Sequence, residues 1–206
     1  MAETPRVLEI FSDYTCPFCY FNMESAEKLA KEFEIPIRWR CFPLHPEVPR
    51  DGIRLEDLLN VPSSEVEKWG REFAKAASQL GLPFKPLGKT YNSRMAQELG
   101  QWASDQGKGH AYHMAAFQAF FAKGLNIASH DILLDIAEAA GLPRDEAGEV
   151  LTERTYNEAV DKDWDLARTM KITAVPTMVY GENRLIGAKS YEKMAALISS
   201  ANGQLL

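Results

Sequence analysis

The sequence predicts an α/β fold whose chain is interrupted by a large all-helical insertion. Three observations predict it: a strand–helix–strand pattern over about the first forty residues, helical periodicity over about the next hundred, and a return to strands in about the last fifty. The length of 206 residues suits one elaborated domain better than two separate domains.

The first unit is predicted from a change in hydrophobic period. Residues 7–12 form an apolar run typical of a buried strand, residues 17–33 follow the three-and-four spacing of a helix, and residues 37–42 alternate like a second strand. Pro17 suits the first helical turn, because the missing N–H leaves no helical hydrogen bond unmade. Three prolines within residues 43–49 then mark a connector and the best candidate for a boundary.

The insertion is predicted to consist of successive amphipathic helices. Apolar side chains recur at helical spacing, and a glycine follows each of the first four helices. Ser64 with Glu67 forms a candidate capping box for the first helix, and Ser129 is a candidate cap for the fourth. A fifth, short helix is expected from Pro143. The expected stops are Gly81, Gly107, Gly124 and Gly141.

The last part of the chain changes back to strands. A helix is expected up to about residue 172, followed by a short strand at residues 178–180, a turn, a partner strand at residues 184–187 and a final helix after Ser190. The order β-α-β, then helices, then α-β-β-α is the order of the thioredoxin fold with helices inserted in its middle.

The predicted division of the chain follows from this order. Residues 1–49 are expected to form the first part of the thioredoxin fold, residues 50–154 the helical insertion, and residues 155–206 the second part of the fold.

Composition excludes several classes of protein. The formal net charge is −6, from 23 basic and 29 acidic side chains, which argues against a nucleic-acid-binding surface. No run of eighteen apolar residues occurs in the sequence, so no membrane span is expected. The start lacks the basic residues and long apolar stretch of a secretory signal, and together with Met1 it leads us to expect a cytoplasmic protein. Composition leaves the oligomeric state open.

The motif that carries chemistry is Cys16-Pro17-Phe18-Cys19, located between the first predicted strand and the first predicted helix. Cys16 would lie at the helix N-terminus, where unpaired N–H groups and the helix dipole favour a thiolate. Cys19 would lie one turn deeper and more buried, within reach of the first sulfur. We therefore expect Cys16 to attack a substrate and Cys19 to resolve the mixed disulfide.

Other interpretations of the cysteines are weaker. Half of a zinc site would need further ligands, and no second C-x-x-C motif occurs; an iron–sulfur cluster would need four cysteines, and the chain has three. Both residues could instead be buried helix residues, but the strand-to-helix position and the proline argue against that. No metal is expected. Cys41, in the second strand, is interpreted as a small buried core residue.

Several polar and aromatic side chains are secondary candidates. Asp13 either disfavours the nearby thiolate or is a solvated turn residue. Asn92 and Ser93 could reach the site from the insertion, although Ser93 suits a helix N-cap equally well. The aromatic stripes within residues 69–73 and 117–121 favour insertion core, with a substrate groove as the alternative.

The histidines show no framework of cysteines or carboxylates that would make them metal ligands. They are interpreted as structural or surface residues: His45, His110, His113 and His130.

These motifs resemble a known family. The segments occur in family order along nearly the whole chain, and the similarity is to DsbA-like thioredoxin-fold oxidoreductases, closest to the FrnE-type branch. That branch also resembles 2-hydroxychromene-2-carboxylate isomerases and kappa-class glutathione transferases. The segments that carry the resemblance lie within residues 11–20, 42–46, 91–94, 120–124, 174–177 and 187–188.

The resemblance implies further site residues. It implies a cis proline at Pro176 that packs against the cysteines, and a backbone at Val175 that pairs with a bound peptide or thiol substrate. Phe18 and Asn92 complete the candidate substrate-binding set. The closest branch usually has Pro-Trp between the cysteines, whereas this chain has Pro17-Phe18, and the intervening pair tunes the reduction potential.

The expected function is dithiol–disulfide exchange. The isomerases and transferases typically have a serine in the position of Cys16, whereas this chain has both cysteines. We expect a protein or small-molecule thiol–disulfide oxidoreductase with no metal or bound organic cofactor, with glutathione as a candidate redox partner. Two alternatives remain: a glutathione-dependent isomerase or transferase that acts on an aromatic small molecule, and a redox-switched chaperone or binding module.

Overall fold

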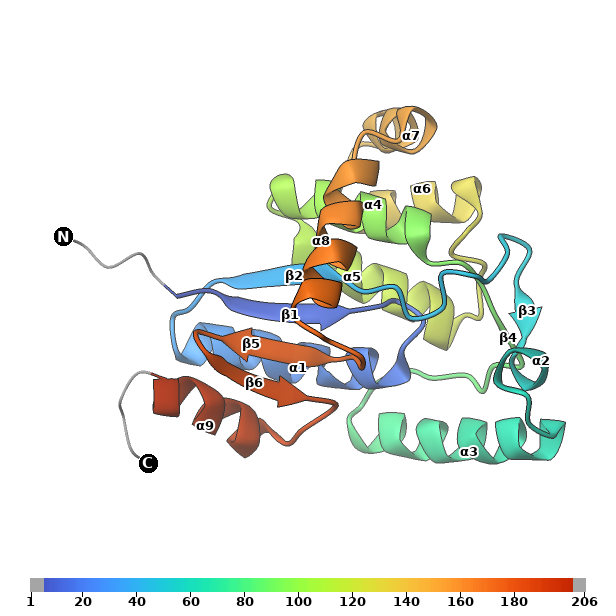
Figure 1. The fold of residues 1–206 in the computed structure, drawn as a ribbon. Coiled ribbons are helices and arrows are strands. Elements are labelled where there is room, and N and C mark those ends of the chain that lie inside the picture. The colour runs from blue at the N-terminus through green and yellow to red at the C-terminus, as the bar shows by residue number, and fades with distance from the viewer. Residues whose placement is uncertain (1–5, 202–206) are drawn as a thin grey trace.

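The computed structural model describes residues 6–201 and contains a mixed, four-stranded sheet (Figure 1). The strand order is β2 (Ile37–Cys41), β1 (Leu8–Ser12), β5 (Thr177–Tyr180) and β6 (Asn183–Ile186). Strand β1 pairs with β2 in parallel and with β5 antiparallel, and β6 pairs antiparallel with β5. Strands from the N-terminal part (β1 and β2) and from the C-terminal part (β5 and β6) therefore form a single sheet.

Helices cover both faces of this sheet. α1 (Pro17–Glu32) and α9 (Tyr191–Ala201) pack together on one face, where their apolar side chains meet Leu8 and Ile10 of β1. α8 (Asn157–Thr169) covers the other face, and its Asp163 accepts a hydrogen bond at 2.8 Å from Arg40 of β2. The alternation of side chains along β1 directs neighbouring residues to opposite layers.

The insertion forms two groups of helices (Figure 1). One group lies beside the start of α1 and consists of α2 (Leu55–Leu59) and α3 (Ser63–Gln79). The other packs against the sheet domain and contains α4 (Arg94–Asp105), α5 (Gly109–Phe117), a π-helix η1 (Gln118–Ala122), α6 (His130–Ala139) and α7 (Arg144–Glu153).

A short antiparallel ribbon joins the two groups. β3 (Ile53–Arg54) and β4 (Lys89–Thr90) pair where the chain enters and leaves the α2–α3 segment. From the sequence we expected helices and loops here. Two-residue strands are too short to show a hydrophobic period, so only the pairing of distant segments reveals them.

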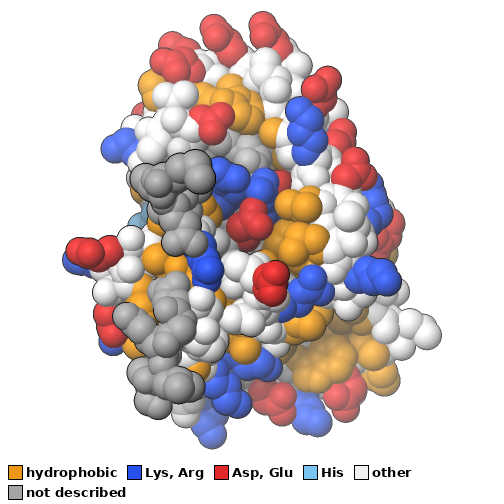
Figure 2. Space-filling model, turned by 60° about the vertical axis from the view of Figure 1, so that its left-hand side comes forward, with side chains coloured by type: hydrophobic (Ala, Val, Ile, Leu, Met, Phe, Trp, Pro, Cys, Tyr) orange, Lys and Arg blue, Asp and Glu red, His pale blue; other side chains and the backbone are white. Residues whose placement is uncertain are grey.

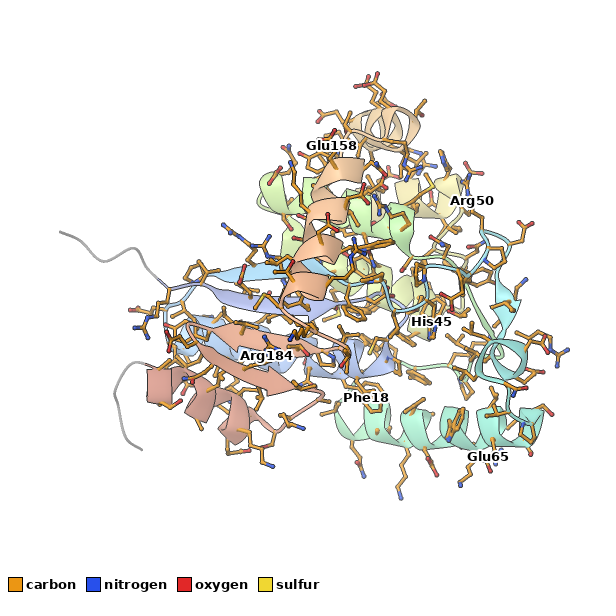
Figure 3. All side chains as sticks on the ribbon, in the orientation of Figure 1. Phe18, His45, Arg50, Glu65, Glu158 and Arg184 are labelled. Carbon is orange, nitrogen blue, oxygen red and sulfur yellow. The ribbon has the colours of Figure 1, made fainter. Side chains whose placement is uncertain are left out.

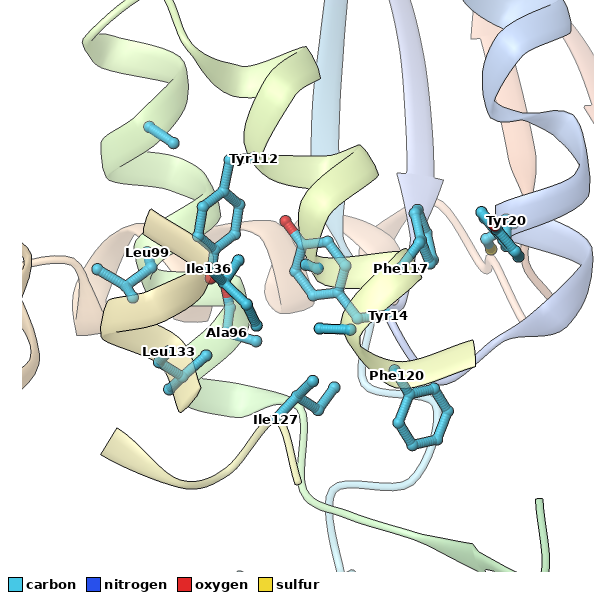
Figure 4. Close-up of a cluster of buried hydrophobic side chains, with 14 of the residues drawn as sticks. Tyr14, Tyr20, Ala96, Leu99, Tyr112, Phe117, Phe120, Ile127, Leu133 and Ile136 are labelled. Atoms are coloured by element: carbon cyan, nitrogen blue, oxygen red, sulfur yellow. The ribbon is translucent and has the colours of Figure 1, made fainter. Parts of the chain in front are cut away.

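The core is continuous between the sheet and the insertion. One buried cluster contains Phe11 of β1, Leu99 of α4 and Tyr112 of α5, and Figure 4 shows Tyr14 between Tyr112 and Phe117. Ring centroids of Tyr14 and Phe117 lie 5.3 Å apart with the edge of one ring toward the other. The insertion is therefore packed on the segment that follows β1.

The helix boundaries confirm part of the sequence analysis and correct another part. Gly81 and Gly141 follow α3 and α6 with φ of 70° and 77°, as expected for glycine stops. The capping box predicted from Ser64 is wrong, because α3 begins one residue earlier, at Ser63, and Pro62 is its N-cap residue. Ser129 is the N-cap residue of α6 but makes no side-chain cap hydrogen bond.

The surface carries charges of both signs. Figure 2 shows Lys and Arg side chains interspersed with Asp and Glu side chains over one face, with hydrophobic side chains in small groups. Within residues 6–201 no helix is long and apolar enough to cross a membrane. Met1, on which the cytoplasmic expectation partly depends, lies outside the described residues.

Candidate active site

The site is built at the junction of β1 and α1. Cys16 is the N-cap residue of α1, with extended backbone angles of φ −89° and ψ 113°, and Pro17 opens the helix. The N–H groups of Cys19 and Tyr20 donate to the Cys16 carbonyl at 3.1 Å and 3.3 Å. This geometry directs the positive end of the helix dipole at the first cysteine, as the motif predicts.

The two thiols of the motif are free and have different surroundings. Cys16 and Cys19 are 4% and 2% exposed, so exposed area alone does not distinguish them. The Cys16 thiol lines a cavity and donates to the Val175 carbonyl at 3.5 Å. Cys19 lies outside the cavity lining, and burial together with the neighbouring Cys16 raises the pKa of its thiol well above the ordinary value. Of these two thiols, only that of Cys16 lines the cavity.

The segment before β5 completes the surroundings of Cys16. β5 pairs antiparallel with β1 through Phe11 and Thr177, which brings Val175 beside the loop after β1. The Val175–Pro176 peptide bond is cis. The Pro176 carbonyl accepts a hydrogen bond at 2.7 Å from the Gly187 N–H, which ties this segment to the end of β6. Val175 is thus held with its carbonyl toward the Cys16 sulfur.

A buried carboxylate holds the loop between β1 and Cys16. Asp13 is 1% exposed and accepts five hydrogen bonds. Its Oδ1 accepts from the N–H and hydroxyl of Thr15 at 2.8 Å and 2.7 Å. Its Oδ2 accepts from Ser93 at 2.8 Å, Gln97 at 2.9 Å and the Leu44 N–H at 3.4 Å. Burial raises the pKa of the Asp13 carboxyl, and these donors oppose the rise.

This carboxylate therefore joins three parts of the fold. Gln97 of α4 also donates to the Phe42 carbonyl at 2.9 Å and accepts from the indole N–H of Trp164 on α8 at 2.9 Å. The alternative of a solvated turn residue is wrong for Asp13. Ser93 is the N-cap residue of α4, but its hydroxyl donates to Asp13 and makes no cap hydrogen bond.

A cavity of about 390 Å³ opens beside Cys16. It lies between the start of α1, the α2–α3 segment and the segment before β5. Among the described residues that line it, Cys16 and His45 carry the titratable groups. Its aromatic lining consists of Phe18, Trp69, Phe73, Phe84, Phe120 and Phe121. The cavity can hold an apolar group next to the Cys16 sulfur.

Phe18 stands at the mouth of this cavity. Its side chain is 45% exposed, and Figure 3 shows it at the start of α1 on the side of α3. Its ring meets the ring of Phe73 on α3 edge to face, with centroids 5.5 Å apart. The aromatic stripe on α3 therefore faces the cysteine motif, which favours the substrate-groove interpretation for Trp69 and Phe73.

The π-helix supplies the far wall. Phe121 stacks on Tyr20 and on Phe84, with centroid distances of 5.5 Å and 5.4 Å. The Phe121 carbonyl accepts from the Lys85 N–H at 2.7 Å, which fixes the loop after α3 against the wall. A π-turn changes the hydrogen-bonding register and is frequent near functional sites.

Similarity to known proteins extends over nearly the whole chain. The model of the family described as DSBA-like thioredoxin domain matches residues 7–199. The chain belongs to this family. It is 31% identical over 195 residues to the protein YwbO of Bacillus subtilis (strain 168), a match that covers 93% of this chain and 95% of that protein.

Two further similarities are to an oxidoreductase structure and to an isomerase. The crystal structure of probable DsbA oxidoreductase SCO1869 from Streptomyces coelicolor matches with a TM-score of 0.89 at 22% identity, covering 98% of this chain and 92% of that one. The 2-hydroxychromene-2-carboxylate isomerase of Pseudomonas putida is 22% identical over 205 residues, covering 97% and 95%. The resemblance and the thioredoxin-like fold with its helical insertion are confirmed.

His45 lies at the candidate site, although the sequence did not suggest it as a site residue. His45 was expected to be structural or on the surface, whereas it lines the cavity that Cys16 also lines, and its Nδ1 lies 3.5 Å from Glu47 Oε1. Figure 3 shows His45 on the segment that follows β2. One signal in the sequence could have indicated His45 as a site residue. It directly follows residues 42–44, which carry part of the family resemblance.

Asn92 occupies a different position from the one expected. Its amide donates to the carbonyls of Pro46 and Val48 at 3.2 Å and 2.8 Å, and its Oδ1 accepts from the Arg94 N–H at 2.9 Å. It lines a separate cavity and is not among the residues that line the Cys16 cavity. Its side chain holds the connector after β2 in place, which leaves no free amide for a substrate.

The remaining candidates lie away from the cavity. Cys41 is 8% exposed, and the Gln101 amide lies 3.3 Å from its sulfur; burial raises the pKa of its thiol. His113 is buried beside Tyr14, and burial lowers the pKa of its imidazole to about 3. Within residues 6–201 no group of three or more His, Cys, Asp or Glu side chains could hold a metal ion.

Proposed function

We propose that this DSBA-like protein is a dithiol–disulfide oxidoreductase that uses Cys16 and Cys19. One observation carries the proposal: both thiols lie at the start of α1, with Cys16 on an apolar cavity and Cys19 buried behind it. A nucleophile that meets the substrate and a second thiol within reach of the first are the two requirements of thiol–disulfide exchange.

In the first step the Cys16 thiolate attacks one sulfur of a substrate disulfide. A bond forms between Cys16 Sγ and that sulfur, the substrate S–S bond breaks, and the other substrate sulfur leaves as a thiolate that takes up a proton. The N-terminal end of α1 favours the attacking anion. The Val175 carbonyl, 3.5 Å from Cys16 Sγ, marks the backbone edge along which a peptide or thiol substrate would lie.

In the second step Cys19 attacks the Cys16 sulfur of the mixed disulfide. The Cys16–Cys19 disulfide forms, and the substrate leaves as a thiol that takes the proton of Cys19. The substrate disulfide is thereby reduced and the protein dithiol oxidised. The reverse sequence oxidises a substrate dithiol by the same route.

The cavity indicates which substrates the protein takes. Its aromatic wall favours a disulfide or thiol whose neighbouring group is apolar, and His45 offers a polar contact at the same wall. Glutathione, a small thiol, is the proposed redox partner that returns the Cys16–Cys19 pair to its starting state.

The test compares turnover of an aromatic disulfide and of insulin by the wild-type protein and by cysteine variants. Cys16→Ser should abolish turnover, and Cys19→Ser should accumulate the mixed disulfide, which mass spectrometry detects. Cys41→Ala is the matched control, because Cys41 is buried away from the cavity, and it should keep wild-type turnover. Full turnover by Cys16→Ser would refute the proposal.

A second candidate is a glutathione-dependent isomerase that acts on an aromatic small molecule. The aromatic lining of the cavity and the similarity to the Pseudomonas putida isomerase favour it. Isomerisation needs no second thiol, so Cys19→Ser decides between the two. A variant that loses disulfide exchange but retains glutathione-dependent isomerisation of an aromatic substrate would favour the isomerase.

The direction of the reaction depends on the reduction potential of the Cys16–Cys19 pair. A potential near that of thioredoxin would indicate a reductase, which suits the cytoplasmic location that we expect, and a much less negative one an oxidant. Equilibration with glutathione buffers of known ratio measures it. Binding of an unfolded protein without turnover would instead favour the redox-switched binding module.

A further inference from the structure

The imidazole of His45 shares the apolar cavity with the Cys16 thiol, and the other described side chains that line this cavity are not ionisable. The side chain is 30% exposed at the cavity wall. Its Nδ1 lies 3.5 Å from Glu47 Oε1, and the imidazole makes no other polar contact within residues 6–201. The Nε2 atom is therefore left for a molecule that enters the cavity.

The buried Asp13 carboxylate holds the approaches to Cys16 and His45 together. Its Oδ1 accepts from the Thr15 N–H at 2.8 Å, and its Oδ2 accepts from the Leu44 N–H at 3.4 Å. Thr15 directly precedes Cys16, and Leu44 directly precedes His45. Because both oxygens belong to one carboxylate, the backbone that leads to the nucleophile lies beside the backbone that leads to the imidazole. A substrate that fills the cavity therefore meets both side chains.

The connector beyond His45 is fixed as well. The His45 carbonyl accepts from the Val48 N–H at 3.2 Å, which closes a turn over Pro46 and Glu47. The Asn92 amide donates to the carbonyls of Pro46 and Val48 at 3.2 Å and 2.8 Å. This turn brings the Glu47 carboxylate back toward the imidazole. A carboxylate on one ring nitrogen orients a histidine and stabilises its protonated form, an arrangement that suits proton transfer by the other nitrogen.

We propose that His45 donates a proton to the sulfur that leaves the substrate when Cys16 attacks, an inference that rests on the proposed function. The bond from Cys16 Sγ to one substrate sulfur forms and the substrate S–S bond breaks. The departing sulfur takes the Nε2 proton of the His45 imidazolium and leaves as a neutral thiol. The neutral imidazole then regains a proton from solvent, and Glu47 stabilises the imidazolium. The later attack by Cys19 uses the proton of Cys19 itself.

The aromatic wall of the cavity makes a proton donor useful. A thiolate that departs among aromatic rings lacks the hydration that stabilises it in water, and a proton delivered as the S–S bond breaks removes that charge. The need for the proton depends on the leaving thiol, because a less basic thiolate leaves faster. The effect of His45 should therefore be large for a strongly basic leaving thiolate and small for a weakly basic one.

The experiment isolates the first step and compares two aromatic disulfides. Cys19→Ser serves as the parent, because its mixed disulfide accumulates and quenched-flow mass spectrometry measures the rate at which it forms. Dithiobis(nitrobenzoate) releases a weakly basic thiolate, whereas bis(carboxybenzyl) disulfide releases a strongly basic one. When His45→Gln is added to the parent, the reaction of the carboxybenzyl disulfide should slow about tenfold, and that of dithiobis(nitrobenzoate) by less than about twofold.

Two further variants separate proton transfer from other roles. Glu47→Gln keeps the imidazole but removes its carboxylate partner, and it should slow the carboxybenzyl disulfide about threefold and leave dithiobis(nitrobenzoate) unchanged. His110→Gln is the matched control, because His110 lines a different cavity and lies 2.9 Å from Glu27. It should match the parent with both disulfides. Thermal unfolding of each variant reports on the fold.

Three results would overturn the inference. Equal slowing of both disulfides by His45→Gln shows that His45 binds the substrate carboxylate or supports the structure, since both substrates carry that group. Unchanged rates with both disulfides refute a role for His45 while the proposed function stands. Absence of a mixed disulfide in the parent variant with either substrate refutes the exchange mechanism itself, and the inference with it.

Discussion

Three thiols in this protein have three different surroundings. Cys16 lines the apolar cavity at the start of α1, Cys19 lies in the core behind it, and Cys41 lies on β2 beside Gln101. Burial raises the pKa of the Cys19 and Cys41 thiols. A thiol with a raised pKa is a poor nucleophile at neutral pH, because the thiolate is the reactive species.

The thiols should therefore label in a defined order. Brief treatment of the reduced protein with iodoacetamide at neutral pH should modify Cys16 first, with Cys19 and Cys41 at least about tenfold slower. Peptide mapping by mass spectrometry measures the order. Guanidinium-unfolded protein is the control, in which all three should label at similar rates. Equal labelling in the folded state would contradict the assigned roles.

The Asp13 carboxylate should contribute strongly to stability. Asp13→Asn replaces one acceptor oxygen by a donor that faces other donors, so we expect a loss of about 2 kcal/mol in the free energy of unfolding. Urea unfolding measures it. Asp51→Asn, at an exposed loop position, is the matched control and should change stability by less than about 0.5 kcal/mol. Equal effects of the two changes would refute the assigned role of Asp13.

His113 should make stability depend on pH. Its folded pKa of about 3 lies below the ordinary value of 6.5, because the imidazole is buried. The Gly109 carbonyl, 2.9 Å from Nδ1, opposes this lowering of the pKa. The unfolded chain therefore takes up a proton that the folded chain does not. The stabilisation is complete above pH about 6.5 and is lost as the pH falls toward about 3, by about 1.4 kcal/mol per pH unit.

The measurement is urea unfolding at several pH values from about 7 to about 5. The pH range stays above the ordinary titration range of exposed carboxylates, and the difference in slope between His113→Asn and the wild type isolates the histidine from carboxyls with raised pKa such as Asp13. His113→Asn should flatten the slope by about one proton. His130→Gln, at a half-buried position in α6, is the control and should keep the wild-type slope. An unchanged slope in His113→Asn would show that another group titrates.

Among the elements, α3 forms one wall of the cavity beside Cys16. The helix packs its apolar face toward the start of α1, and Phe73 contacts the rings of Phe18 and Phe84 with centroids 5.5 Å and 6.3 Å away. The β3–β4 ribbon ties both ends of the α2–α3 segment to the rest of the insertion. This wall, rather than the motif, should select substrates by their apolar groups.

Phe73→Ala should therefore weaken the binding of apolar substrates. Loss of a large aromatic surface at the cavity should raise KM for an aromatic disulfide about tenfold, while turnover of the polar glutathione disulfide stays near the wild-type value. Steady-state kinetics with both substrates measure this. Leu80→Ala, at a 48% exposed residue directly after α3, is the control. Equal effects on both substrates would point to a general loss of structure.

At the scale of the whole molecule, the insertion and the sheet share one core. The buried cluster contains Phe11 of β1. It extends from Tyr14, after β1, to Leu99 of α4 and Leu133 of α6 (Figure 4). Segments that share a core unfold together, since neither can keep its buried surface without the other. The insertion thus stabilises the loop that holds Cys16.

Unfolding should accordingly be one cooperative transition. The helical circular dichroism signal, most of which comes from the insertion, and the exposure of Cys19 to alkylation should report the same midpoint on heating. Leu99→Ala in α4 should lower both midpoints together, since a buried Leu→Ala change costs about 2–5 kcal/mol. A midpoint for Cys19 exposure that stays at the wild-type value would show that the insertion unfolds separately.

Local patterns in the sequence predict the order of the main elements and the position of the cysteine motif between β1 and α1. Residues 7–33 contain a strand, a C-x-x-C motif and an amphipathic helix in immediate succession, and such local signals depend only on residue spacing. Cys16 at the N-cap of α1 and the glycine stops of the helices follow from the same rules. The pairing of β5 with β6 follows from the turn predicted between them.

The tertiary structure alone decided which side chains surround the sulfur atoms. The α3 stripe lies at the cavity, His45 lines it and Asn92 does not, and Asp13 is buried under five donors. Apart from the two hydrogen bonds from Thr15 to Asp13, each of these contacts joins segments at least about thirty residues apart or depends on which face of a helix meets the core. Periodicity shows that a face is apolar, and only packing shows whether that face meets core or cavity.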